Sequence, residues 1–223
     1  MKATFEIGHL AKAGLFRDFS KGSWFLDEKQ AAFAGGRTLY MDYTLAMGLM
    51  SGYSGTSKFG PYDSLTRAQA ATILYRLANP ESTATTLEGD YATENTTGLS
   101  DVETDKYYTA AVNWAKDLEI ITGYLSGKNA GKFLPEGKVT RQELATMIYR
   151  FCMKCSDAEA TFADVEGFDD SFRIADWAVE GLGFCKANGI MNGVYGTNKL
   201  NPTGNANRAE MSKMIAVTAR DVM

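Results

Sequence analysis

The chain has 223 residues, of which 45% are apolar and 22% are charged, and its formal net charge is −4. This length suits either one large domain or several small ones. The acidic balance argues against a nucleic-acid partner, because a phosphate backbone requires a basic protein face. The sequence has no run of about 18 or more apolar residues, so we expect no membrane insertion.

Residue types that carry catalysis or bind metals are scarce. The one histidine, His9, excludes a site built from several histidines, and a Ser-His-Asp relay would depend on this residue near the N-terminus. The three cysteines, Cys152, Cys155 and Cys185, cannot all pair within the chain. A single Cys-x-x-Cys supplies too few ligands for a structural zinc site. We therefore expect ordinary core or surface thiols, no metal and no cofactor.

The first residues do not resemble a secretion signal. Residues 1–8 hold one basic residue, Lys2, but no unbroken apolar core. We expect either a cytoplasmic protein or a form from which the signal was removed. Weak helical character predicts that residues 1–15 form an extension of the unit that follows.

Three stretches each place an apolar residue two positions before an aspartate. They are Phe16-Arg17-Asp18, Leu99-Ser100-Asp101 and Phe162-Ala163-Asp164. An aspartate at such an entry can cap the turn or helix that follows it. An aromatic position comes after each aspartate, at Trp24, Tyr107 and Trp177.

The residues after each aromatic position predict an amphipathic helix. In the second copy the apolar stripe has the spacing i, i+3, i+4 and i+7, at Tyr108, Ala111, Val112 and Ala115. The third copy places Ala178, Gly181, Leu182 and Cys185 on the same face. Cys185 therefore replaces Ala115 as a small buried apolar residue. The first copy departs from this pattern, because a longer segment containing residues 34–37 follows Trp24 and indicates an insertion.

Each expected first helix ends in a glycine-marked turn, and a proline loop follows. The turns contain Gly52, Gly123 and Gly193, where glycine permits a left-handed helix exit or close approach by another group. The loops are Phe59-Gly60-Pro61, Phe133-Leu134-Pro135 and Leu200-Asn201-Pro202. In all three copies the proline lies five positions before a capping residue.

A helix start that carries an arginine follows each proline loop. The three starts are Thr66-Arg67-Ala68-Gln69, Thr140-Arg141-Gln142-Glu143 and Asn207-Arg208-Ala209-Glu210. Thr or Asn followed three residues later by Glu or Gln is a capping box. An arginine at the first helical position is electrically unfavourable, because the helix dipole favours negative charge there. An anion held between the arginine and free amides of the first turn would resolve this conflict, so we predict anion sites at Arg67, Arg141 and Arg208.

The repeated order of motifs divides the chain into units. We expect an extension at 1–15, repeat 1 with its insertion at 16–78, a polar linker at 79–98, repeat 2 at 99–155 and repeat 3 at 156–223. Because the join between repeats 2 and 3 is short, these two should pack tightly.

These motifs in this order resemble the S-layer homology domain, present three times over nearly the whole chain. The resemblance implies an all-α, three-lobed pseudo-trimer whose central bundle takes one helix from each repeat. It also implies a monomeric, non-catalytic, extracellular module that attaches surface proteins to a Gram-positive-type envelope without covalent bonds. The implied partner is a secondary cell-wall polymer, an acidic polysaccharide that often carries a pyruvate ketal on N-acetylmannosamine.

The resemblance places the ligand in grooves between lobes, lined by the motif arginine, the aromatic residue and the glycine turn. We expect a carboxylate at Arg67, Arg141 or Arg208 and a sugar ring on Trp24, Tyr107 or Trp177. Gly52, Gly123 and Gly193 would let the backbone approach the ligand, and Asp18, Asp101 and Asp164 complete the candidate set. On this interpretation Arg141→Ala or Arg208→Ala weakens wall binding and leaves stability nearly unchanged.

Other interpretations remain open. The arginines could pair with Asp18, Asp101 or Asp164 of a neighbouring repeat. Gln69 replaces the acid of the motif in repeat 1 and Asn207 replaces the threonine in repeat 3, so not every groove need bind. The triplet could be a degenerate scaffold for other proteins. A wall-glycan hydrolase would need two carboxyls about 5–10 Å apart, and the placement of the candidates Asp101, Asp164, Glu143 and Glu210 as caps argues against it.

Overall fold

The computed structural model describes residues 37–54, 58–79 and 94–223. The six α-helices of this part are α3 (Arg37–Ala46), α4 (Arg67–Ala78), α5 (Thr109–Asp117), α6 (Arg141–Cys155), α7 (Val179–Ala187) and α8 (Arg208–Val217). Short helical turns are η2 (Gly127–Asn129), η3 (Ser171–Arg173), η4 (Asp176–Ala178) and η5 (Thr218–Val222). Among the described residues, β pairing is limited to isolated bridges and no strand forms. The prediction of an all-α fold is therefore confirmed.

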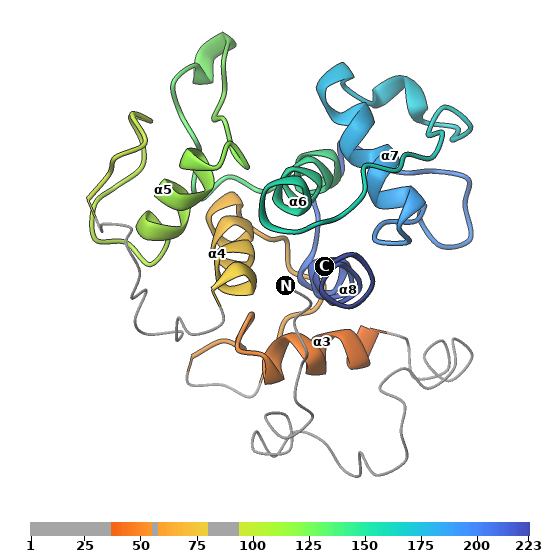
Figure 1. Cartoon of the computed structure of the whole chain (residues 1–223), viewed down its shortest axis with the longest axis horizontal. Helices are drawn as coiled ribbons and strands as arrows, with labels where there is room; N and C mark the ends of the chain where they lie inside the picture. Colours follow the sequence, from red (N-terminus) through yellow and green to blue (C-terminus); the bar gives the residue numbers. More distant parts are fainter. Residues whose placement is uncertain (1–36, 55–57, 80–93) are drawn as a thin grey trace.

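The helices alternate between the centre and the outside of the molecule. The capped helices α4, α6 and α8 lie around the centre, while α3, α5 and α7 lie outside them in three lobes (Figure 1). Each outer helix packs against the capped helix of the preceding repeat: α5 against α4, α7 against α6, and α3 against α8. Each lobe therefore combines two repeats, and the third lobe joins the first repeat to the last. The expected tight packing of repeats 2 and 3 is present as the contact of α7 with α6.

All three predicted capping boxes are formed. In α4 the Thr66 hydroxyl accepts a hydrogen bond from the Gln69 N–H at 3.1 Å, and the Gln69 side chain accepts from the Thr66 N–H at 3.0 Å. The same reciprocal pair joins Thr140 to Glu143 and Asn207 to Glu210. Because these bonds are local, the sequence pattern was sufficient to predict where each central helix begins.

The other first-turn amides of the central helices are not free. The Arg67 N–H donates to the Gly137 carbonyl at 2.9 Å, and the Ala68 N–H donates to the Pro135 carbonyl at 2.9 Å. The equivalent bonds in the other two copies are Arg141 to Gly204, Gln142 to Pro202, Arg208 to Asp63 and Ala209 to Pro61. The prediction that these amides hold an anion is therefore wrong, because the proline loop of the next repeat supplies carbonyls to them.

A closed ring of backbone hydrogen bonds joins the three repeats where the central helices begin. The residue before each cap takes part: Leu65 N–H donates to the Ala206 carbonyl, Ala206 N–H to the Val139 carbonyl, and Val139 N–H to the Leu65 carbonyl, at 2.9, 2.9 and 3.0 Å. All three residues are fully buried. The ring fixes the order in which the repeats follow one another around the centre.

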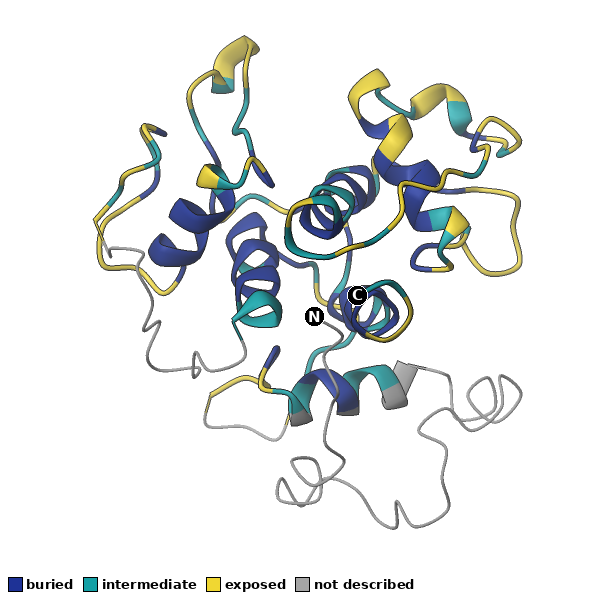
Figure 2. Cartoon of the chain, in the orientation of Figure 1, coloured by how far each residue is buried: buried dark blue, intermediate teal, exposed yellow. Residues whose placement is uncertain are grey.

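The core runs through the central helices and the inner faces of the outer ones, and the tips of the lobes are exposed (Figure 2). Trp114 packs edge-on against Tyr75 of α4, with ring centroids 5.4 Å apart, and against Phe151 of α6 at 6.3 Å. Ala115 and Cys185 are both fully buried, which confirms the prediction that Cys185 fills a small apolar position. None of the described helices is both long and apolar enough to cross a membrane.

Candidate functional site

The motif arginine of each central helix lies against the next repeat. Arg67 is 7% exposed, and its Nε donates to the Phe133 carbonyl at 2.7 Å. Its Nη1 lies 2.6 Å from Glu143 Oε1, and its guanidinium stacks over the rings of Tyr124 and Phe133, 4.9 Å from each centroid. The side chain is thus oriented by groups of repeat 2, although α4 belongs to repeat 1.

Arg141 of repeat 2 makes the equivalent contacts with repeat 3. Its Nε donates to the Leu200 carbonyl at 2.9 Å, its Nη2 donates to the Asn192 carbonyl at 3.2 Å, and its Nη1 lies 2.6 Å from Glu210 Oε1. The interpretation that the arginines pair with Asp101 or Asp164 is therefore wrong. The acids that pair with Arg67 and Arg141 are those that close the capping boxes, which aim their second oxygen at the neighbouring repeat.

Arg208 is the equivalent arginine of repeat 3, but its contacts differ from those of Arg67 and Arg141. Its Nε donates to the Phe59 carbonyl at 2.9 Å and its Nη2 donates to the Ser51 carbonyl, while the guanidinium stacks over Phe59 and Tyr53 at 4.5 and 5.4 Å. The position of Glu143 and Glu210 is taken by Gln69 in repeat 1. Arg208 accordingly forms no ion pair with a residue that the structure describes.

Two aspartates hold the proline loops from within their own repeats. The Asp101 carboxylate accepts from the Phe133 N–H at 2.7 Å and from the Leu134 N–H at 2.9 Å. Leu134 has a φ of 57°, a left-handed conformation that is costly for a leucine, and the carboxylate helps to stabilise it. Asp101 lines neither of the two cavities described below, so its contacts are structural.

The counterpart of Asp101 in repeat 3 is Asp170. Its carboxylate accepts from the Leu200 and Asn201 N–H groups, both at 2.8 Å, and Asn201 also has a positive φ, of 54°. Asp164 is exposed and accepts instead from the Glu166 N–H at 2.7 Å. The expectation that Asp164 is equivalent to Asp101 is therefore wrong. The sequence signal was Phe168-Asp169-Asp170, which repeats Leu99-Ser100-Asp101 six residues after the stretch that we aligned.

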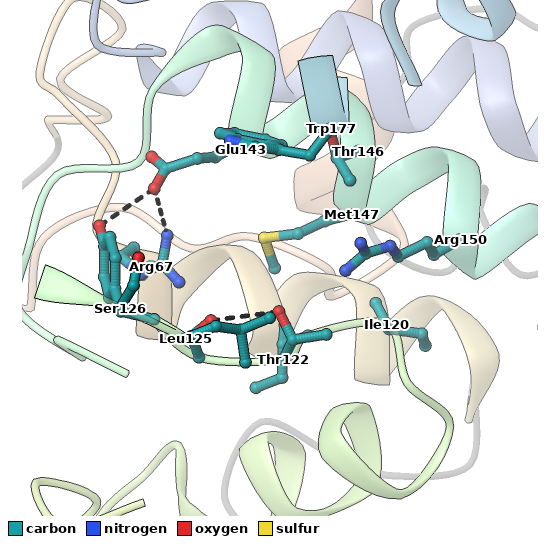
Figure 3. Close-up of a pocket in the computed structure, with 13 residues that line it drawn as sticks. Arg67, Ile120, Thr122, Leu125, Ser126, Glu143, Thr146, Met147, Arg150 and Trp177 are labelled. Carbon is teal, nitrogen blue, oxygen red and sulfur yellow. Dashed lines mark hydrogen bonds and ion pairs between the residues drawn. The ribbon is translucent and has the colours of Figure 1, made fainter. Parts of the chain in front are cut away.

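A cavity of about 420 Å³ lies beside Arg67, and we call it the Arg67 cavity. Three repeats contribute to it: Arg67 from repeat 1, the turn and helix α6 from repeat 2, and Trp177 from repeat 3. Its lining is Arg67, Ile120, Ile121, Thr122, Gly123, Tyr124, Leu125, Ser126, Glu143, Thr146, Met147, Arg150 and Trp177. Arg150 points toward Met147 from the side opposite Arg67, and Trp177 lies along the Glu143 side of the space (Figure 3).

A second cavity, of about 160 Å³, lies beside Arg208, and we call it the Arg208 cavity. It is lined by Leu49, Met50, Ser51, Gln69, Thr72, Ile73, Arg76, Tyr107 and Arg208. Each of these residues has an equivalent in the lining of the Arg67 cavity, in the repeat that follows. For example, Gln69 corresponds to Glu143 and Tyr107 corresponds to Trp177. The two cavities are thus the same site built twice from different repeats.

The aromatic candidates Tyr107 and Trp177 occupy equivalent positions just before α5 and α7. Their exposed fractions are 51% and 52%, and each lines one of the two cavities. Their role in binding a sugar stays a prediction. Trp24 and Asp18 lie outside the described residues, so the predictions that involve them also stay predictions.

The candidate glycines approach the protein's own backbone closely. A Cβ at Gly123 would lie 2.6 Å from Leu99 Cδ2 and 2.9 Å from the Lys132 carbonyl oxygen. At Gly52 and Gly193 the nearest neighbours of a Cβ would lie 2.9 Å away, in Lys58 and Phe168. Of the three, Gly123 lines one of the two cavities. Packing within each repeat therefore explains why these three positions require glycine.

Sequence reasoning missed a second arginine in each cavity. Arg76 and Arg150 lie ten residues after the caps Thr66 and Thr140, and they line the Arg208 and Arg67 cavities respectively. A comparison of the three capped helices beyond their first turn would have revealed this recurrence. Repeat 3 has Val217 at the same position.

The sequence model of the S-layer homology domain matches residues 39–71, 99–145 and 167–212, together more than half of the chain. The chain belongs to the S-layer homology domain family. The third match begins beside Phe168, in agreement with the assignment of Asp170, and not of Asp164, as the aspartate that opens the third S-layer homology repeat.

Relatives of this S-layer homology protein include a surface-layer 125 kDa protein of Lysinibacillus sphaericus, which is 26% identical over 96% of the chain and 16% of the relative. A cellulosome-anchoring protein of Acetivibrio thermocellus is 25% identical over 74% of the chain and 34% of the relative. A surface layer protein of Brevibacillus choshinensis is 35% identical over 47% of the chain and 8% of the relative. The chain therefore spans a minor part of the length of these proteins.

Proposed function

We propose that the chain is a non-catalytic module that anchors proteins to the cell wall by binding an acidic secondary polymer in the grooves between its repeats. The observation that carries this proposal is the construction of the two cavities. Each brings together a buried motif arginine, a second arginine and a half-exposed aromatic ring from three different repeats. The naming of relatives as surface-layer and cellulosome-anchoring proteins supports the same function.

The residues of the cavities suit a sugar that carries a carboxylate, such as a pyruvate ketal on N-acetylmannosamine. A planar guanidinium can hold a carboxylate through two parallel hydrogen bonds. The exposed ring of Trp177 or Tyr107 offers a flat apolar face to the sugar, at a low cost in conformational entropy. A volume of about 420 Å³ lies within the usual range of small-ligand sites, roughly 300–1,000 Å³.

Glycoside cleavage is disfavoured by the carboxylates of the two cavities. The Arg67 cavity contains one, Glu143, which is engaged with Arg67, with the Tyr124 hydroxyl at 3.1 Å and with the Thr140 N–H at 2.8 Å. The lining of the Arg208 cavity contains none. The described lining residues of neither cavity therefore supply the pair of carboxyl groups, an acid and a base or nucleophile, that glycoside cleavage requires.

The proposal locates the protein outside the cell, at a Gram-positive-type envelope, with one chain forming all three lobes. The test is co-sedimentation with purified walls before and after hydrofluoric acid removes their secondary polymer. We expect binding that is lost with the polymer. Equal sedimentation with both preparations would overturn the proposal.

A matched pair of variants distinguishes binding in the Arg67 cavity from non-specific adsorption to the wall. Trp177→Ala removes an exposed ring that lines the Arg67 cavity, whereas Tyr195→Ala removes a fully exposed ring that lines neither cavity. We expect weaker sedimentation for Trp177→Ala alone. If wall fragments fail to raise the melting temperature of the wild type, the alternative of a scaffold that binds other proteins is favoured.

A further inference from the structure

Repeat 3 contains two Asn-Gly pairs, at residues 188–189 and 192–193. In such a pair the backbone nitrogen of the glycine can attack the side-chain carboxamide of the asparagine, and glycine offers no Cβ to hinder the attack. Ammonia leaves and a succinimide ring forms, which water then opens to aspartate or isoaspartate. Whether a folded protein permits this reaction depends on what holds the carboxamide and the attacking N–H.

The pair at Asn188 is held at both groups. Its Nδ2 donates to the Phe184 carbonyl at 2.9 Å, and the Gly189 N–H donates to the Lys186 carbonyl at 3.2 Å. These bonds belong to the C-terminal end of α7, where the chain leaves the helix. They must break before the ring can close, so the fold protects Asn188.

The pair at Asn192 is held at neither group. Asn192 is exposed, and neither its side chain nor the Gly193 N–H forms a hydrogen bond with a described residue. The backbone carbonyl of Asn192 instead accepts from Arg141 Nη2 at 3.2 Å. This carbonyl belongs to the same peptide group as the attacking N–H. A cation at the oxygen stabilises the negative charge that this peptide group acquires when the N–H loses its proton.

We propose that Asn192 is a site of spontaneous deamidation, promoted by Arg141, that places a carboxylate at the contact between repeats 2 and 3. The Gly193 nitrogen gives its proton to solvent and bonds to Asn192 Cγ, and the carboxamide nitrogen takes up a proton and leaves as ammonia. Water then adds to one of the two ring carbonyl carbons and breaks the bond of that carbon to the Gly193 nitrogen. The net reaction consumes one water and releases one ammonia.

The position of Arg141 also favours one of the two products. Arg141 polarises the former backbone carbonyl of Asn192, so water should add preferentially to that carbon. The chain then continues through Cγ, which makes the product isoaspartate. Its free α-carboxylate is the group that Arg141 already contacts, and a charge-assisted hydrogen bond replaces a bond to a neutral carbonyl.

Repeat 1 offers a matched position at which the role of the arginine can be tested. Ser51 is equivalent to Asn192, and its carbonyl accepts from Arg208 Nη2 as the Asn192 carbonyl accepts from Arg141 Nη2. Ser51 is exposed, and the Gly52 N–H that follows makes no hydrogen bond with a described residue. A serine has no carboxamide to close the ring. Ser51→Asn therefore supplies the missing group without changing either arginine.

The experiment compares the two pairs of repeat 3 within one peptide. The full chain is incubated at neutral pH, folded in buffer and unfolded in guanidinium chloride. Trypsin cleaves after Lys186 and Lys199, so residues 187–199 leave as a peptide that contains both pairs. Mass spectrometry with fragmentation then measures asparagine, aspartate and isoaspartate at each position over time.

We expect similar rates at Asn188 and Asn192 in guanidinium chloride, because each asparagine precedes a glycine. In the folded protein Asn192 should convert about 10-fold faster than Asn188, the factor that corresponds to a hydrogen bond that need not be broken. Isoaspartate should form a larger fraction of the product than in guanidinium chloride, and Ser51→Asn should add a second converting site.

Equal suppression of both pairs in the folded protein would overturn the proposed site. An isoaspartate fraction that is the same in both states, or a Ser51→Asn variant that does not convert at this position, would overturn the role of the arginine.

Discussion

Arg67 Nη1 lies 2.6 Å from Glu143 Oε1, so the residue that caps α6 is also the counter-ion of an arginine from the preceding repeat. The other oxygen of Glu143 accepts from the Thr140 N–H at 2.8 Å. The side chains of Arg67 and Glu143 are 9% and 15% exposed, which shields their interaction from solvent. One carboxylate thus couples a helix start, an interface between repeats and the wall of a cavity.

The first prediction concerns Arg141, for which the sequence led us to expect little effect on stability. Arg141→Ala would leave Glu210 without its ion pair and remove the donors to the Leu200 and Asn192 carbonyls. We now expect a loss of about 1–3 kcal/mol in the free energy of unfolding, kept moderate because the Glu210 side chain is 30% exposed. Urea denaturation checks this, and an unchanged midpoint would contradict a structural role for the arginine.

The second prediction concerns the cap of α6. Thr140→Ala should lower the free energy of unfolding by about 0.5–2 kcal/mol, because the Glu143 N–H loses its side-chain acceptor. Thr140→Ser keeps the hydroxyl and serves as the control. Equal losses for the two variants, measured by urea denaturation, would show that the methyl group and not the cap is responsible.

The third prediction tests which aspartate belongs to the motif of repeat 3. Asp170→Ala should destabilise the protein by about 1.5–3 kcal/mol, because two loop N–H groups lose a charged acceptor. Asp164→Ala should change the stability by less than about 0.5 kcal/mol, as is usual for an exposed residue. Thermal unfolding of both variants decides the matter, and the reverse order of the two losses would restore Asp164 to the motif.

The fourth prediction concerns pH. Burial raises the pKa of the Cys185 thiol well above its ordinary value of 9.0, so the folded state binds this proton more tightly than the unfolded state. The resulting stability is fully present below about pH 9 and is lost as the pH rises further. Cys185→Ala copies the residue at the equivalent position of repeat 2, Ala115.

This variant should therefore lose less stability than the wild type between about pH 8 and pH 10. The comparison is made within each protein, by urea denaturation at the two pH values, so that any constant effect of the smaller side chain cancels. Parallel losses in the two proteins would show that the Cys185 thiol does not titrate in this range.

The helix starts and the apolar faces followed from the sequence because the interactions that set them are local. A capping box depends on residues three positions apart, and the stripe from Tyr108 to Ala115 depends on one helical period. The sequence alone also showed that the motifs recur three times in the same order. The assignment of Asp164 failed although it used the same kind of pattern, because a short apolar-x-Asp match occurs twice within a few residues.

The partners of each helix were decided by the tertiary structure alone. A hydrophobic face specifies that it must be buried but not against which surface, because the hydrophobic effect has no direction. The proline-loop carbonyls and the ring through Leu65, Val139 and Ala206 add the directional bonds that place each outer helix on the capped helix of the preceding repeat. That placement paired Arg67 with Glu143, whereas Arg208 forms no ion pair with a residue that the structure describes. This distinction between equivalent arginines exists only once the repeats are packed.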